Sequence, residues 1–266
     1  MELELQGKHV LISGGSKGIG LACAKAFLQE GARVSLVSRA QANIESAVQS
    51  LLASFPDARE CIASFATDLR DPEAAALAAA DAEKKQGPID VLVNCAGAAK
   101  RTPPDELTPR HWHEAMEAKY FTYIHLIDPV IKLMAARGAG AVLNVVGMGG
   151  KAAKATHLPG GAANAALMLV SAGLAAAYGP RGVRVNAVNP GQTLTERLHE
   201  GLKAEARMSG GTPEEALAKA SSELPLGRIA TPEEIANAVV FLCSPRASYI
   251  SGAILAMDGA LTPMVV

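Results

Sequence analysis

Short apolar runs alternate along the chain with longer segments in which apolar residues recur at helical spacing. Apolar runs of this length are typical of buried parallel strands, because helices cover such strands on both faces. We predict strands near residues 9–12, 33–37, 60–65, 89–93, 141–146, 183–188 and 253–257. We predict helices near residues 19–30, 42–54, 72–86, 109–136, 160–178, 198–208, 213–222 and 232–243. This alternation predicts an α/β fold, a doubly wound parallel sheet of about seven strands with helices on both faces, as one domain over residues 1–266.

One segment interrupts the alternation after the sixth predicted strand. Residues 196–224 are polar, are punctuated by glycines and have a helical pattern. Long insertions in compact domains are usually functional, and many of them cover an active site. We therefore predict that this segment is a mobile lid over a substrate.

A glycine-rich turn follows the first predicted strand. Residues 13–20 read Ser-Gly-Gly-Ser-Lys-Gly-Ile-Gly and lead directly into a helix that ends before Gly31. Glycines allow the backbone to turn tightly and to approach a pyrophosphate, and the first amides of the helix point at the anion. Between a strand and a helix, this spacing strongly indicates that the chain binds a dinucleotide.

The end of the second predicted strand bears on the choice of nucleotide. An NAD site usually has a carboxylate there, which binds the ribose 2′-hydroxyl. This chain has Ser38 and Arg39 instead, and Lys17 lies in the glycine-rich turn. Two cations without a carboxylate suit a 2′-phosphate, so we predict NADP(H) over NAD(H). The alternative interpretation of Arg39 is a solvated loop charge.

Composition and charge narrow the class of protein. Apolar residues make up 49% of the chain and the net charge is −1, which gives no broad basic field for nucleic acid. Residues 1–5 are acidic and unlike a signal peptide, and no apolar stretch is long enough to span a bilayer. The four cysteines are scattered without metal-ligand spacing. We expect a cytoplasmic protein that binds no metal, nucleic acid or membrane.

Further motifs follow the other strands in order. They are Asp68-Leu69, Asn94-Cys95-Ala96-Gly97, Asn189-Pro190-Gly191-Gln192-Thr193-Leu194-Thr195, Pro225-Leu226-Gly227-Arg228 and Asp258-Gly259. Together with the glycine-rich turn, they resemble the short-chain dehydrogenase/reductase family over essentially the whole chain. The resemblance implies a single Rossmann domain, a nicotinamide dinucleotide, and a dimer or tetramer. The turn, the charges and the resemblance assign these residues to the cofactor: Gly14, Ser16, Lys17, Gly18, Ile19, Gly20, Ser38, Arg39, Asp68, Leu69, Asn94, Ala96, Gly97, Pro190, Gly191, Thr193 and Thr195.

The resemblance also predicts that the usual catalytic residues are replaced. In the family, a Tyr is the general acid or base, and the Lys of Tyr-x-x-x-Lys lowers its pKa and binds the nicotinamide ribose. A Ser orients the carbonyl, and an Asn lies on an earlier helix. Counted back from Pro190, these four positions fall on Gly160, Asn164, Gly147 and Lys119 respectively. Tyr-x-x-x-Lys occurs nowhere in the chain.

Two residues are candidates for the proton chemistry that these replacements remove. Lys119 carries an ammonium that Asn164 lacks. His157 lies three residues before Gly160 and is of a type that titrates near neutral pH. Each has an ordinary alternative, a solvent-facing or subunit-contact lysine and a loop histidine. The sequence therefore assigns no catalytic residue.

Cations gather in the stretches after the fourth and fifth predicted strands, which line the mouth of the site in this kind of sheet. They are Lys100, Arg101, Lys151, Lys154 and His157, opposed nearby only by Asp105 and Glu106. Glycines at 147 and 160 would also widen the site. A large anionic ligand, such as an acyl-CoA or an aryl carboxylate, suits this field, and plain surface solvation is the alternative.

Three classes of function remain open. The first is a dinucleotide-binding subunit without ordinary catalysis, which pairs with an identical chain or an active paralogue through the helices near 109–136 and 160–178. The second is an oxidoreductase with a rebuilt proton path. The third is a non-redox enzyme of the lyase or hydrolase type on the same scaffold, acting on an anionic or CoA-linked substrate. In each case we expect ordinary carbonyl reduction to be weak or absent.

Overall fold

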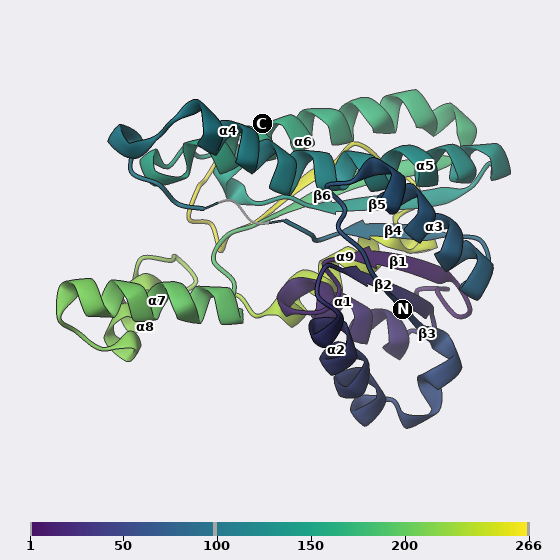
Figure 1. Cartoon of the computed structure of the whole chain (residues 1–266), viewed down its shortest axis with the longest axis horizontal. Coiled ribbons are helices and arrows are strands. Elements are labelled where there is room, and N and C mark those ends of the chain that lie inside the picture. The colour runs from purple at the N-terminus through teal and green to yellow at the C-terminus, as the bar shows by residue number, and fades with distance from the viewer. Residues whose placement is uncertain (1, 98–99, 265–266) are drawn as a thin grey trace.

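Seven parallel strands form one sheet at the centre of the structure, a computed structural model that describes residues 2–97 and 100–264 (Figure 1). The strands lie in the order β3-β2-β1-β4-β5-β6-β7. Their bounds are β1 His9–Ser13, β2 Arg33–Ser38, β3 Ile62–Ala66, β4 Val91–Asn94, β5 Gly140–Val145, β6 Val183–Pro190 and β7 Ile254–Met257. The inner strands are buried along nearly their whole length, which explains their continuous apolar sequences. The predicted α/β fold with a doubly wound parallel sheet is confirmed.

Helices cover both faces of this sheet. One face packs on α1, α2 and α9, and the other packs on α3, α5 and α6 (Figure 1). The helix bounds are α1 Gly18–Gln29, α2 Gln41–Ser54, α3 Pro72–Gln86, α4 Pro109–Ala115, α5 Thr122–Arg137, α6 Leu158–Tyr178, α7 Glu196–Ser209, α8 Pro213–Ser222 and α9 Pro232–Cys243. Each face has its own apolar core, with Phe27 and Val239 in the first and Leu126 and Leu167 in the second. The helices begin and end close to the positions that the sequence pattern predicts.

The segment predicted as one helix over 109–136 contains a wider turn. α4 and α5 are α-helical, and Met116–Phe121 between them is π-helical. A π-helical turn accommodates an extra residue within a helix and is frequent at functional sites. Apolar spacing did not reveal it, because the helical period is regular on either side. Lys119 lies in this turn, so the turn sets the direction of its side chain.

α6 contradicts the expectation that no apolar stretch of the chain is long enough to span a bilayer. Among the described residues, the stretch Ala155–Arg181 is long and apolar enough to cross a membrane by length and composition alone. The expectation that no stretch has this length is therefore wrong. The inner face of α6, with Ala163, Leu167 and Ala175, is buried, whereas Leu169 is exposed. Since the core helix of a soluble protein passes the same test, the length is weak evidence for a membrane span.

Two helices stand apart from the sheet. α7 and α8 pack on each other and extend to one side of the molecule in Figure 1. The chain leaves the sheet after β6, and the amide of Leu194 donates to the carbonyl of Ala230 at 2.8 Å, where the chain returns. Both ends of this excursion therefore meet beside β6. The helical pattern of residues 196–224 is explained, and their movement as a lid stays a prediction.

Candidate active site

The predicted site residues meet at the carboxyl edge of the sheet. The chain proceeds from β1 through β2 to β3 and then crosses to β4 on the opposite side of β1. The loops after β1 and β4 therefore lead away in opposite directions and leave a crevice, which is where ligands bind in such sheets. Gly14 and Ala96 belong to these two loops and lie against each other, since a Cβ placed on Gly14 would be 2.8 Å from the Ala96 nitrogen.

The glycine-rich turn fits a dinucleotide pyrophosphate. Gly14 has a φ of +66°, and a side chain there would collide with the loop after β4. A Cβ on Gly20 would collide with the carbonyl of Gly14, so α1 packs tightly behind the turn. The Lys17 side chain occupies the N-cap position of α1 without a capping hydrogen bond, whereas the Thr231 side chain caps α9. The first amides of α1 are thus left for an anionic ligand.

The residues predicted to select the nucleotide lie beside this turn. Ser16 Oγ donates to Ser38 Oγ at 2.9 Å, which ties the turn to the end of β2. Arg39 is exposed directly after β2. Lys17 Nζ lies 3.1 Å from a carboxylate oxygen of Glu196, and both side chains are exposed. Charge reasoning missed Glu196 because it lies 179 residues away in the sequence.

Asp68 and Leu69, predicted to hold the adenine, differ in their surroundings. Leu69 is buried in the core beneath α3 and α5. Asp68 forms an ion pair with Arg70. The hydrogen bond from Arg70 holds the pKa of the Asp68 carboxyl below its usual value, and the charge of Arg39 adds to this effect. At this position the polar group available to a ligand is therefore that of Asp68.

A buried hydrogen-bond network supports the loop after β4. Ser13 Oγ donates to Asn94 Oδ1 at 3.2 Å and accepts from the two backbone amides that follow Asn94. Asn94 Nδ2 donates to Asn144 Oδ1 at 3.0 Å, and Asn144 Nδ2 donates to Ser171 Oγ at 2.9 Å. The amide of Asn94 is therefore engaged inside the protein, where it holds the loop in place. Sequence reasoning missed Ser13, Asn144 and Ser171, although polar residues inside apolar segments are a visible signal.

The loop after β6 carries two buried polar atoms that lack a hydrogen-bond partner among the described residues, Gln192 Oε1 and Thr193 Oγ1. Buried polar atoms are nearly always paired, so a ligand at this loop would supply the missing bonds. Thr195 accepts a hydrogen bond from the Leu198 amide at 3.4 Å as the N-cap of α7. Its methyl group faces the glycine-rich turn, since a Cβ on Gly18 would lie 3.2 Å away. The two loops thus face each other across the crevice.

Lys119 is buried beside the crevice and does not face solvent. Its Nζ donates to Tyr123 Oη at 2.7 Å and to the Val145 carbonyl at 3.0 Å. Tyr123 Oη donates to the same carbonyl at 2.6 Å. A Cβ on Gly97 would lie 3.0 Å from Lys119 Cδ, so the lysine stem packs under the loop after β4. The solvent-facing interpretation of Lys119 is therefore wrong, and sequence reasoning missed its partner Tyr123, one helical turn further on.

Burial changes the proton affinities of this pair. Desolvation lowers the pKa of Lys119 from 10.5 to about 7, with Cys95 opposing this change and Arg197 adding to it. Burial raises the pKa of Tyr123, which keeps its phenol protonated. Lys119 is therefore an amine that gains or loses a proton close to neutral pH.

The positions predicted to replace the family's catalytic residues lie together. Gly147 has a φ of +127°, and a Cβ there would lie 3.3 Å from Asn164 Nδ2. A Cβ on Gly149 would lie 3.6 Å from the same amide nitrogen and 2.9 Å from His157 Cδ2. Gly160 is buried at the start of α6. The structure thus brings Asn164 to the space that Gly147 leaves open, and His157 to the neighbouring space at Gly149.

His157 lies among cations and keeps one ring nitrogen unpaired. Its Nδ1 is buried without a hydrogen-bond partner among the described residues. Burial lowers the pKa of His157, and positive charges lower it further. These charges belong to Arg101, Arg197, Lys154 and Lys119. The imidazole is therefore held in its neutral form at neutral pH.

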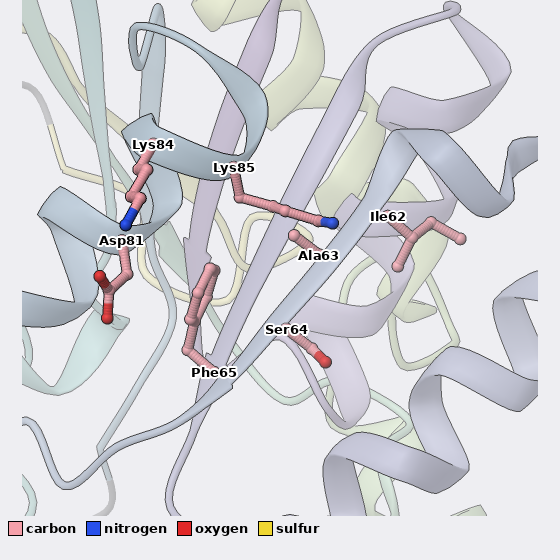
Figure 2. Close-up of a pocket in the computed structure, with 7 residues that line it drawn as sticks. All are labelled: Ile62, Ala63, Ser64, Phe65, Asp81, Lys84 and Lys85. Atoms are coloured by element: carbon pink, nitrogen blue, oxygen red, sulfur yellow. The ribbon is translucent and has the colours of Figure 1, made fainter.

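One cavity lies beside the site and another lies away from it. The larger, of about 870 Å³, opens beside the site, since its lining includes Asp68 and Lys100 as well as Ala118 and Pro159, the neighbours of Lys119 and Gly160. The smaller, of about 490 Å³, lies at the sheet edge between β3 and α3 (Figure 2). Figure 2 shows the side chains that line it, among them Phe65 of β3 and Lys84 and Lys85 of α3. None of the predicted site residues lines this second cavity.

Comparisons with known sequences agree with this arrangement. A family described as Enoyl-(Acyl carrier protein) reductase matches residues 14–262. The chain is 37% identical to D-threitol dehydrogenase of Mycolicibacterium smegmatis over 262 residues, which are 98% of this chain and 95% of that protein. The family match thus includes strands β2 to β7 and helices α1 to α9.

Solved structures show the same architecture. L-Sorbose reductase from Gluconobacter frateurii, in complex with NADPH and L-sorbose, has a TM-score of 0.93 and 31% identity over 100% of both chains. An NADPH-bound short-chain oxidoreductase from Pseudomonas aeruginosa, described as containing an atypical catalytic center, has a TM-score of 0.89 and 26% identity. That match covers 98% of this chain and 99% of the other.

Proposed function

This chain belongs to the short-chain dehydrogenase/reductase family, and we propose that it is an NADP(H)-dependent oxidoreductase with an altered proton path. Its relatives are named as dehydrogenases and reductases, which favours redox chemistry over the lyase or hydrolase alternative. The substrate end of the reaction is an alcohol and its carbonyl product, as in those relatives.

The cofactor part of the proposal rests on the crevice between the loops after β1 and β4. The glycine-rich turn and the uncapped start of α1 suit a pyrophosphate, and the orphaned hydroxyl of Thr193 suits a polar ligand group. Lys17 and Arg39 favour a 2′-phosphate, and both solved relatives described above contain NADPH. When bound, the nicotinamide supplies or accepts the hydride.

The altered proton path rests on one observation, the buried amine of Lys119. It lies at the position where the family has an Asn, and its pKa of about 7 lets it exchange a proton near neutral pH. Tyr123 and the Val145 carbonyl hold the nitrogen in one place. Gly147 and Gly160 have no hydroxyl to offer a substrate. We therefore assign proton exchange to Lys119, with His157 as the group nearer to solvent.

Asn164 and His157 complete the site in this proposal. The Asn164 amide borders the space at Gly147, so it can donate a hydrogen bond to a substrate oxygen. The neutral His157 imidazole has an unpaired nitrogen, and its ring lies at Gly149, near the same Asn164 amide. The Pseudomonas aeruginosa relative with an atypical center supports the idea that this scaffold accepts a changed set of catalytic groups.

A second candidate is a cofactor-binding subunit without ordinary catalysis. The observation in its favour is that both hydrogen bonds of the Lys119 amine go to the protein's own groups, so the amine reaches a substrate only if one of these bonds opens. Such a subunit would pair through α5 and α6 with an identical chain or with an active paralogue. In either case we expect standard ketones to be reduced slowly.

The test measures binding and turnover separately. NADPH and NADH are titrated by nucleotide fluorescence, and NADPH oxidation is then followed with L-sorbose and a panel of other ketones. We expect NADPH to bind more tightly and turnover to fall by about 10²–10⁴-fold in Lys119→Met, the usual worth of acid–base catalysis. Lys132→Met, an exposed lysine of α5 paired with Asp128, is the control and should not change the rate.

The outcomes separate the two candidates. NADPH binding with turnover that depends on Lys119 supports the oxidoreductase. NADPH binding with no turnover by wild type on any ketone supports the non-catalytic subunit. Fast turnover that is unaffected by Lys119→Met and by His157→Asn would show that the assigned proton path is wrong.

A further inference from the structure

Positive charge gathers on one side of the candidate active site. Three segments contribute: the loop after β4 with Arg101, the turn before α6 with Lys154, and the start of α7 with Arg197. The amide of Thr102 donates to the carbonyl of Thr156 at 2.9 Å and holds the first two segments together. We call these three cations, together with the neutral His157 on which their charges act, the cationic cluster.

The centre of this cluster is His157. Its ring lies against Gly149, where a Cβ would be 2.9 Å from His157 Cδ2 and 3.6 Å from Asn164 Nδ2. Its Nδ1 is buried and has no hydrogen-bond partner within the described residues. Native proteins rarely leave a buried nitrogen without a hydrogen-bond partner. The missing partner of His157 Nδ1 therefore points to a polar group of a bound ligand. The four charges that act on this ring are all positive.

Two cations of the cluster lack a carboxylate partner. Some cations elsewhere have one, as Arg137 faces Glu83 and Arg228 faces Glu234. Within residues 2–97 and 100–264, Arg101 and Lys154 have no such ion pair. Like charges such as those of Arg101 and Lys154, held near each other without an ion pair, destabilise a fold, and departures of this kind are expected at functional sites.

We propose that the cationic cluster binds an anionic group of the substrate, a carboxylate or a phosphate. This inference rests on the proposed function for the identity of the bound molecule and names its class: a ketone or alcohol that also carries an anion. Arg101 suits the anion because a guanidinium donates two parallel hydrogen bonds to a carboxylate or phosphate. The cluster lies on the α6 side of the crevice, whereas the phosphate cradle of the cofactor lies at the start of α1. The two anion sites are therefore distinct.

The test compares each anionic ligand with a neutral analogue of similar structure. Binding to the protein with saturating NADP⁺, and to the protein alone, is measured by isothermal titration calorimetry. The carboxylate pair is 4-acetylbenzoate and its methyl ester, and the phosphate pair is dihydroxyacetone phosphate and dihydroxyacetone. In at least one pair we expect the anion to bind about 10-fold more tightly or better, the usual effect of a charge-assisted hydrogen bond. The pair that shows the larger ratio identifies the anion.

Two neutralising variants locate the site. Arg101→Gln and Lys154→Gln should each reduce the preference for the anion about 10-fold and leave binding of the neutral partner unchanged. Lys84→Gln, which removes an exposed charge of α3, is the matched control and should keep the preference. Both altered side chains are exposed, so the variants are expected to fold.

Each outcome decides the proposal. Equal binding of anion and neutral partner in both pairs by wild type overturns it, whether or not the protein turns over ketones. A preference that survives both Arg101→Gln and Lys154→Gln overturns it as well, because the anion is then bound elsewhere. A preference that both variants abolish, in a protein that shows no NADPH-dependent turnover, supports the anion site while the proposed oxidoreductase function fails.

Discussion

Lys119→Met should change how the stability of the protein depends on pH. The unfolded lysine keeps its proton up to a pKa of 10.5, whereas burial lowers the folded value to about 7. Between these values the unfolded chain binds more protons, so the free energy of unfolding of wild type rises with pH. The cost of the buried ammonium is present below about pH 7 and disappears as pH rises toward 10.5. Methionine has no proton to lose and removes this dependence.

The size of this pH dependence follows from the difference between the pKa of Lys119 in the folded and in the unfolded protein. Each pH unit over which the two states differ by one proton changes the free energy of unfolding by ~1.4 kcal/mol. From about pH 7 to about pH 9, where the folded lysine starts half protonated, the gain is ~2 kcal/mol. We therefore expect the stability of wild type relative to Lys119→Met to increase by ~2 kcal/mol over that range. In the variant, the loss of the hydrogen bonds to Tyr123 and Val145 changes the free energy of unfolding by the same amount at pH 7 and at pH 9. It therefore does not affect how the difference from wild type depends on pH.

Urea denaturation followed by circular dichroism measures the difference directly. Wild type and Lys119→Met are unfolded at several pH values, and their free energies are compared at each value. Lys132→Met, which alters an exposed lysine with an Asp128 partner, controls for loss of a positive charge and should give a difference that does not rise in this way. A wild-type-minus-variant difference that stays constant from pH 7 to pH 9 would mean that the Lys119 amine is hydrated, and the argument from its burial would fail.

Four further predictions follow from the same residues. Arg39→Asp should weaken NADPH binding by about 1.5–3 kcal/mol and remove or reverse the preference over NADH in fluorescence titrations; tighter NADH binding by wild type would contradict it. His9 is buried with a lowered pKa, so the neutral ring stabilises the fold above pH 6.5, and wild type should lose stability relative to His9→Gln as pH falls below 6.5 in thermal melts. The triple variant Gly147→Ser, Gly160→Tyr and Asn164→Lys should raise NADPH-dependent ketone reduction above wild type in a spectrophotometric assay; a folded variant no faster than wild type would contradict it. Light scattering at micromolar concentration should show a dimer or tetramer, and a monomer would count against pairing through α5 and α6.

The fold could be predicted from the sequence because its signals are local. Each buried strand is a continuous apolar run, and each helix has its own period and its own ends. The glycine-rich turn was also local, since the strand, the turn and the helix are consecutive. Fold and cofactor crevice therefore followed from segments of about ten to thirty residues.

The candidate site could not be predicted in the same way, because it depends on contacts between residues that are far apart in the sequence. Lys17 pairs with Glu196, and Lys119 of the π-helical turn donates to the Val145 carbonyl on β5. No periodicity links such residues, because only the packed sheet brings them together. Lys119 itself was identified, but the sequence could not distinguish a solvent-facing lysine from a buried one. Burial, the property that sets its pKa, exists only in the folded chain.

The position of the Lys119 amine depends on the number of residues in the π-helical turn Met116–Phe121. Successive residues of an α-helix are rotated by about 100° around its axis. Deleting one residue from this turn would let α4 and α5 join as one regular helix. Lys119 would then swing by about that angle, away from Val145, although none of its neighbours had changed. A related chain that matches this one at every aligned position, but is one residue shorter here, would lack the amine in the crevice. A relative thus keeps this site only if it keeps both the lysine and the number of residues in the turn.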